Sequence, residues 1–169
     1  MASDPPCQLT ALDMGVLEGM MDRLEAQAAA DSDIARLLRR KLAAARVRLC
    51  DDIDPFVATI NSRVEFHVDH GPIETGVLTH GGERALPGSA LPISSLRGMA
   101  LLGLAEGDTI AIELADGRTE VLGVVRVAHQ PEAARLKRRP RFGIIDGGRS
   151  HRNYTPIGPE DDDPGPHAA

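Results

Sequence analysis

The chain of 169 residues has a formal net charge of −6 and a pI near 5.5. It lacks the basic footprint that unaided binding to a nucleic-acid backbone requires, so we expect no direct sequence-specific contact with nucleic acid. Three Phe, one Tyr and no Trp leave few aromatic side chains to line a ligand pocket, which disfavours a small-molecule enzyme.

The two cysteines, Cys7 and Cys50, are too few for a disulfide framework or a cysteine-rich metal site, which fits a reducing compartment. Residues 1–9 are predicted to be a polar leader. The N-terminal sequence MASDPPCQLTALDMG lacks the basic segment and the apolar core of a signal peptide. No run approaches the ~18 apolar residues of a membrane span. We therefore expect a soluble, cytoplasmic protein.

Residues 10–49 are predicted to form an antiparallel hairpin of two helices, a short coiled coil. Thr10 is placed to cap the first helix, with Asp13 in its first turn. Each predicted helix has roughly 17 to 19 residues, which gives a hairpin ~25 to 28 Å long. Apolar residues recur at helical spacing in both halves: Leu12, Val16, Leu17, Met20, Met21 and Leu24, then Ile34, Leu37, Leu38, Leu42 and Ala45.

The polar residues of the second helix support the same prediction. Asp31 or Ser32 is placed to cap it. The cationic side chains are expected mostly off its apolar face: Arg36, Arg39, Arg40 and Lys41. Pro55 then ends the helical region, because proline cannot extend a helix and biases Asp54 towards an extended conformation. Residues 50–55 are therefore predicted to be a hinge that sets the direction of the hairpin.

Residues 56–134 are predicted to form a small, mainly antiparallel β domain with one short helix, so the fold class is α+β. The predicted strands cover 56–69, 72–79, 107–114 and 119–130, with a short strand near residue 92. The sequence DHGP joins the first two strands, and Asp116-Gly117 is a good turn between the last two. A helix over 94–104 is expected to be capped by Ser94 or Ser95. Asn61 and Ser62 are expected to make local hydrogen bonds with the backbone.

Residues 135–169 are predicted to be a mobile tail, because an acidic, proline-rich stretch follows a basic run and neither can be buried. The basic run contains Arg135, Lys137, Arg138, Arg139 and Arg141. Contact of this run with a polymer phosphate or an acidic surface is the alternative interpretation.

Three constellations could carry chemistry, and none predicts a catalytic centre or a metal site. His67, Asp69, His70 and His80 could approach one another, but no His-x-x-x-His or Cys pair supports a metal-binding cluster. Ser94 and Ser95 lie outside any G-x-S-x-G motif, so capping is the better interpretation than nucleophilic catalysis. The glycine pairs at 81–82 and 147–148 lack the strand, helix and Lys of a phosphate-binding loop.

Asp31 and Asp33 lie at the turn of the predicted hairpin. Either one could serve the second helix, as a cap or in its first turn, where an acidic side chain is favourable. Both carboxylates could also be presented to a cation or to a partner protein. The two roles are compatible.

The sequence resembles the Gre-type transcription elongation factors, and more closely their short-hairpin branch called Rnk, regulator of nucleoside diphosphate kinase. The resemblance spans residues 10–134. It is carried by Asn61-Ser62, by ALLGL at 100–104 with Gly107-Asp108, and by QPEA at 130–133.

This resemblance implies a C-terminal domain similar to FK506-binding proteins, which docks at the mouth of the RNA polymerase secondary channel. It places the docking contacts at Ser94, Ser95, Leu96 and Arg97, where Leu96 replaces the proline of the Ser-Ser-Pro pattern. In true Gre factors, carboxylates at the hairpin tip reach the catalytic metal of the polymerase and stimulate transcript cleavage. Here the predicted hairpin is shorter, and Asp31-Ser32-Asp33 stands in place of Asp-x-x-Glu-Asn.

We therefore expect a non-enzymatic regulator that docks on RNA polymerase without stimulating cleavage and competes with other channel-binding factors. It should need no cofactor, and the sequence does not predict an oligomeric state. Three alternatives remain open. The chain could be a cleavage factor that uses Asp31 and Asp33, a peptidyl-prolyl isomerase suggested by fold similarity alone, or a direct regulator of nucleoside diphosphate kinase.

Overall fold

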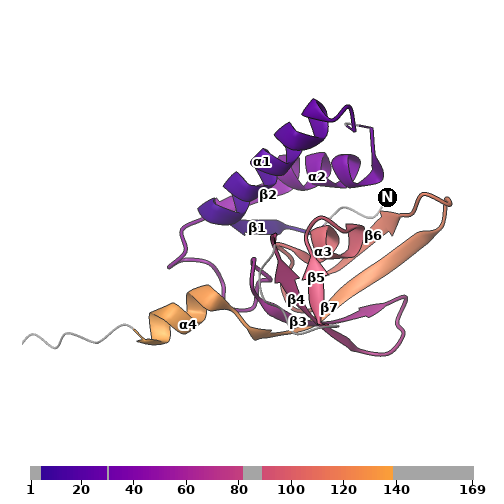
Figure 1. The fold of residues 1–169 in the computed structure, drawn as a ribbon. Helices are drawn as coiled ribbons and strands as arrows, with labels where there is room; N and C mark the ends of the chain where they lie inside the picture. Colours follow the sequence, from indigo (N-terminus) through magenta and orange to yellow (C-terminus); the bar gives the residue numbers. More distant parts are fainter. Residues whose placement is uncertain (1–4, 30, 82–88, 139–169) are drawn as a thin grey trace, which may run out of the picture. The chain divides into compact units, whose positions relative to one another are not determined.

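The computed structural model describes residues 5–29, 31–81 and 89–138 and has the predicted α+β character (Figure 1). Most of the basic and acidic tail predicted from residue 135, including Arg139 and Arg141, lies outside the described residues. The elements in chain order are β1 (Cys7–Thr10), α1 (Ala11–Ala26), α2 (Asp33–Ala44), β2 (Ala45–Arg48), β3 (Arg63–Val68), β4 (Glu74–Thr79), β5 (Ala90–Pro92), α3 (Leu96–Leu101), β6 (Thr109–Glu113), β7 (Thr119–His129) and α4 (Pro131–Arg138). Among the described residues, no helix is long and apolar enough to cross a membrane.

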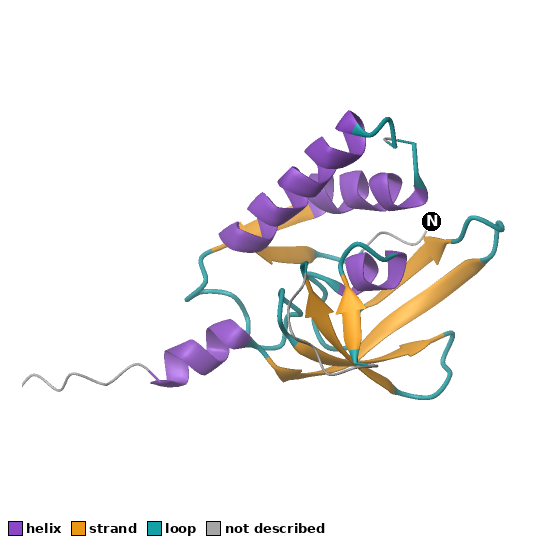
Figure 2. Ribbon diagram, viewed as in Figure 1, coloured by secondary structure: helices purple, strands orange, loops and turns teal. Residues whose placement is uncertain are grey.

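The helical hairpin begins where the sequence predicts. Thr10 caps α1 through a reciprocal pair of hydrogen bonds: its Oγ1 accepts from the Asp13 N–H at 3.0 Å, and Asp13 Oδ2 accepts from the Thr10 N–H at 3.2 Å. Ser32 caps α2, with its Oγ accepting from the Ala35 N–H at 3.3 Å. Figure 2 shows the two helices folded back on each other.

The helices are shorter than predicted, with 16 residues in α1 and 12 in α2. The chain leaves the helix at Ala45 and continues as β2, which pairs in parallel with β1 from Cys7↔Ala45 to Thr10↔Arg48. Residues 7–9 of the predicted leader therefore belong to a strand. Pairing with β1 provides hydrogen-bond partners for backbone groups of residues 45–48, which would have bonded within the helix if α2 were longer.

Strands between residues 63 and 129 form a five-stranded sheet in the order β5-β4-β3-β7-β6. All neighbouring strands are antiparallel except β4 and β5. The predicted turns are present: Asp69 and His70 between β3 and β4 both adopt positive φ angles, and so does Gly117 between β6 and β7. The predicted short helix is α3, which Ser95 caps.

The first predicted strand begins later than expected, at Arg63 rather than at residue 56. Residues 57–62 form an irregular, largely buried segment in which Asn61 has a φ of 67°. The local bonding predicted for Asn61-Ser62 is confirmed for Ser62, whose Oγ accepts from the Thr59 N–H at 3.0 Å. These turn-like bonds take up backbone groups that a strand would use, so they explain the later start.

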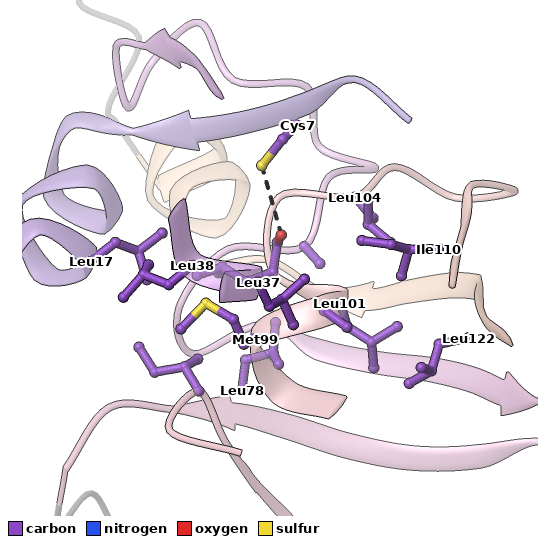
Figure 3. Packing of buried hydrophobic residues seen from close by; sticks show 14 of the residues in the cluster. Cys7, Leu17, Leu37, Leu38, Leu78, Met99, Leu101, Leu104, Ile110 and Leu122 are labelled. Atoms are coloured by element: carbon purple, nitrogen blue, oxygen red, sulfur yellow. Dashed lines mark hydrogen bonds between the residues drawn. The ribbon is translucent and has the colours of Figure 1, made fainter. Parts of the chain in front are cut away.

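The hairpin and the sheet share one hydrophobic core, although the sequence predicts two modules divided by a hinge. Leu17 of α1 and Leu38 of α2 belong to the same buried cluster as Leu78 of β4 and Met99 of α3 (Figure 3). All four side chains are fully buried. The direction of the hairpin is therefore set by packing against the sheet, and not by residues 50–55 alone.

Candidate functional site

The predicted docking contacts, residues 94–97, lie at the start of α3 and are called the docking segment below. Ser95 Oγ accepts from the Gly98 N–H at 3.1 Å and donates to the Pro92 carbonyl at 2.7 Å. This hydroxyl therefore caps the N-terminal end of α3 and links the helix to Pro92 of β5.

Arg97 is held by the sheet. Its Nε and one terminal nitrogen donate to the two carboxylate oxygens of Glu120 on β7, each at 2.9 Å. These hydrogen bonds raise the pKa of Arg97, and partial burial offsets some of the rise. Since Glu120 engages one edge of the planar guanidinium through two parallel hydrogen bonds, Arg97 orients the docking segment and leaves fewer of its donors for a partner.

Ser94 and Leu96 face the helical arm, the name used here for α1, α2 and the turn that joins them. Ser94 is exposed and lines a cavity of about 360 Å³ together with Met20, Leu24 and Ile34 of the arm. Leu96 lines a second cavity, of about 180 Å³, opposite Leu37 of α2. The arm therefore runs along the docking segment instead of standing away from it.

Two cationic side chains of α2 fix the arm to the sheet domain. Lys41 is buried, and its Nζ donates to the Leu102 carbonyl at the end of α3. Arg40 donates to the Ala111 carbonyl of β6 at 3.0 Å. These contacts and the burial of Leu37 and Leu38 attach α2 along its length.

The burial of Lys41 differs from the prediction that the cationic residues of this helix lie mostly off its apolar face. The signal was present, since Lys41 follows Leu38 by three residues and Leu37 by four, the spacing of one helix face. Its aliphatic stem can lie among apolar side chains while its ammonium reaches a carbonyl oxygen.

Asp31 and Asp33 have different positions in the structure. Asp31 is exposed in the turn between the helices. Asp33 lies in the first turn of α2, forms an ion pair with Arg36 and lines the same cavity as Leu96. The structure therefore brings Asp33 near the docking segment, and it does not present the two carboxylates as a pair at a free end.

A buried polar network fixes the segment that follows the predicted hinge. Gln130 Nε2 donates to the carbonyls of Asp54 and Val57 at 2.8 and 2.9 Å. Glu132 Oε2 accepts from the Thr59 hydroxyl at 2.8 Å. The QPEA motif, which the sequence analysis used for family resemblance, therefore has a structural role: it ties α4 to residues 54–59. Residues 135–138, predicted as tail, instead continue α4.

Asp13 joins this network from the arm, because its Oδ1 accepts from the Ile60 N–H at 3.3 Å. Burial raises the pKa of the Asp13 carboxyl. Its hydrogen bonds with Thr10 and Ile60 act in the opposite direction, and the nearby Glu132 carboxylate adds to the rise.

The histidine cluster considered in the sequence analysis is not assembled as a metal site. The rings of His67 and His70 stack with centroids 5.1 Å apart, and Asp69 Oδ1 accepts from the Val121 N–H at 2.8 Å. His80 instead lines the cavity beside Ser94. Within residues 5–29, 31–81 and 89–138, no three His, Cys, Asp or Glu side chains are grouped so that they could hold a metal ion.

Comparison with known proteins supports the resemblance seen in the sequence, although no family model matches the chain. The regulators of nucleoside diphosphate kinase from Escherichia coli (strain K12) and Shigella flexneri are each 34% identical to it over 112 residues, which are 66% of this chain and 82% of theirs. The solved structure of a prokaryotic transcription elongation factor GreA/GreB from Nitrosomonas europaea is 28% identical, with a TM-score of 0.56, and the match covers 75% of this chain and 100% of that one. The chain therefore belongs to the Gre-type transcription factor family, in the branch of the regulators of nucleoside diphosphate kinase.

Proposed function

We propose that this chain is a transcription regulator that binds RNA polymerase at the secondary channel without stimulating transcript cleavage. Its sheet domain, which we propose to be of the FK506-binding type, would provide the contact through the docking segment. Its packed helical arm would occupy the channel entrance. RNA polymerase is then the principal partner, and the site of action is the cytoplasm.

The observation that supports this function is the attachment of the arm to the sheet domain. An arm that stimulates cleavage must carry its acidic residues to the metal inside the polymerase. Releasing α2 would expose Leu37 and Leu38 and break the hydrogen bond from Lys41 to Leu102. Each leucine contributes about 2 kcal/mol by burial and a buried hydrogen bond about 1 kcal/mol. A free-energy cost of several kcal/mol therefore opposes the release of α2 from the sheet domain. Asp33 then stays beside Leu96.

Binding is tested by capture of core RNA polymerase on the immobilised full chain, with and without a competing Gre factor. We expect capture that the competitor reduces. Ser94→Arg should weaken capture, because Ser94 is exposed in the docking segment. Thr75→Arg, at an exposed position of β4, is the matched control. Absence of capture, or equal effects of the two substitutions, would reject the proposed docking.

Cleavage is tested on backtracked transcription complexes at a concentration of the chain that saturates capture. We expect the transcript to keep its length with the unmodified chain and with the Asp31→Ala/Asp33→Ala variant alike. Shortening that requires the two carboxylates would instead identify a cleavage factor. Acceleration of prolyl isomerisation in a peptide assay would support the isomerase alternative.

Direct action on nucleoside diphosphate kinase is a second candidate, because the curated relatives carry the name regulator of nucleoside diphosphate kinase. It is tested by measuring the activity of the purified kinase with increasing amounts of the full chain. A saturable change in activity, without RNA polymerase present, would support direct regulation. Unchanged kinase activity together with polymerase capture would support our proposal.

A further inference from the structure

A second candidate interaction surface lies between the end of β7, helix α4 and the Pro55-Phe56 turn, and contains no residue of the docking segment. The structure has a groove of about 480 Å³ here. We call it the α4 groove. Its lining residues include Phe56, Val127, Ala133, Ala134, Lys137 and Arg138.

The apolar wall of the α4 groove is formed by an exposed aromatic ring on a fixed backbone. Phe56 is 56% exposed, although it is one of three phenylalanines in the chain. Its N–H donates to Asp54 Oδ1 at 2.9 Å, and its carbonyl accepts from the Glu106 N–H at 3.0 Å. An exposed aromatic side chain that needs little ordering on binding is typical of an interface anchor.

Cationic side chains also line the groove. Lys137 and Arg138 of α4 are among its lining residues, and Arg135 is exposed on the same helix. Within the described part of the chain, no ion pair neutralises Arg135, Lys137 or Arg138. This local cluster stands in contrast to the net charge of −6 of the whole chain.

The carboxylates beside the α4 groove bond to backbone or hydroxyl donors. Asp54 Oδ1 accepts from the Phe56 N–H at 2.9 Å, Glu106 Oε1 accepts from the Val127 N–H at 2.7 Å, and Glu132 Oε2 accepts from the Thr59 hydroxyl. None of them forms an ion pair with the cationic side chains of α4 in the described part of the chain, so these side chains attract negative charge from outside the molecule.

The backbone edge along the groove is occupied at Val127. The pairing between β6 and β7 ends at Gly123, so the strand continues without a β6 partner through His129. The Val127 N–H on this segment is taken by Glu106. A charged side chain at a strand edge opposes the addition of another strand, so recognition here should depend on side chains.

We propose that the α4 groove binds an acidic peptide segment of a partner protein that carries a large apolar residue. The apolar side chain would pack against Phe56 and Val127, and flanking carboxylates would pair with Lys137 and Arg138. A nucleic acid fits this surface less well, because its phosphates can pair with the cationic side chains but leave the apolar wall without a partner.

The test uses the full chain without polymerase, so its outcome is independent of the proposed function. The probe is a fluorescein-labelled peptide of alternating Glu and Asp with Phe-Leu at its centre, and binding is followed by fluorescence anisotropy. Phe56→Ala and Lys137→Glu/Arg138→Glu should each weaken binding about tenfold, as expected for an anchor residue and for a pair of charge contacts. Amide NMR shifts should localise the peptide to Phe56, Val127 and Ala133.

The controls are matched to these substitutions. Ile73→Ala removes another exposed apolar side chain, and Arg46→Glu/Arg48→Glu reverses two exposed charges on β2, so neither should affect binding. A peptide with Phe-Leu replaced by Gly-Gly should bind about tenfold more weakly. Equal binding of that peptide, tighter binding of single-stranded oligothymidine, or no binding of the probe would overturn the inference.

Discussion

Gly103 lies where β1 crosses the end of α3. It has a φ of 80°, and a Cβ atom there would be 2.5 Å from Cys7 Sγ and 2.9 Å from the Gln8 carbonyl oxygen. The Gln8 N–H donates to the Gly103 carbonyl at 2.9 Å, so β1 cannot move away without losing this bond. Close approach of two backbones makes glycine necessary at this position.

Gly103→Ala should therefore lower the free energy of unfolding by about 2 to 4 kcal/mol, the sum of left-handed strain and overpacking. Gly117→Ala is the matched control, because Gly117 also has a φ of 80° but would place its Cβ in open space. The control should lose only about 1 kcal/mol. Urea denaturation measures both, and equal losses would show that the contact with β1 is not tight.

Asp13 makes stability depend on pH. Burial raises its pKa above the ordinary value of 3.8, so the folded chain binds this proton more tightly than the unfolded chain does. The resulting stabilisation is fully present below pH 3.8 and is lost as the pH rises through the raised pKa. The free energy of unfolding relative to an Asp13→Asn variant should therefore fall as the pH rises above 3.8. Urea denaturation across this range checks it, and a difference that grows with pH would contradict the assignment.

Residues whose role is local were predictable from the sequence. The caps at Thr10, Ser32 and Ser95 were among the predicted positions, because capping depends on the next three residues only. The hydrogen bonds of Lys41 and Gln130 could not be predicted, because their acceptors lie far away in the sequence. Lys41 donates to Leu102, and Gln130 donates to Asp54 and Val57.

At the scale of elements, helical periodicity and turn residues located both helices of the arm, α3 and the β6–β7 hairpin. The β1–β2 pair was missed, because its strands are only 4 residues each and its parallel register joins distant segments. The sequence predicts a strand for the irregular segment before β3, because this segment is rich in Val, Ile and Thr. In the structure its apolar residues, such as Val57 and Ile60, are buried without the regular alternation of a strand.

Leu38→Ala should weaken the arm and the sheet together. Leu38 is fully buried in the common core, so its truncation should cost about 2 to 5 kcal/mol. Hydrogen exchange should accelerate in α3 and β4 as well as in α2, within one unfolding transition. Leu12→Ala, at a side chain that is 62% exposed, should change stability by less than about 0.5 kcal/mol. Loss of protection in α2 alone would contradict a shared core.

At the scale of the whole molecule, the packing of the arm is what the sequence could not provide. The sequence predicts a short arm whose direction is set by a hinge at residues 50–55. Attachment along α2 depends on surfaces that meet only in the folded chain, such as Leu37 opposite Leu96. The proposed lack of cleavage therefore has two physical reasons, since the arm is short and also fastened beside the docking segment.

The proposed function requires that the arm remains packed when the protein acts. The most direct measurement is the distance between spin labels at Glu25→Cys on α1 and Ala115→Cys on the β6–β7 turn, in a Cys50→Ser background. Glu25, Ala115 and Cys50 are exposed, and Cys7 is buried away from the label. We predict one narrow distance distribution that saturating core RNA polymerase leaves unchanged. A second, longer distance that grows with added polymerase would show that the arm is released, and would contradict the account.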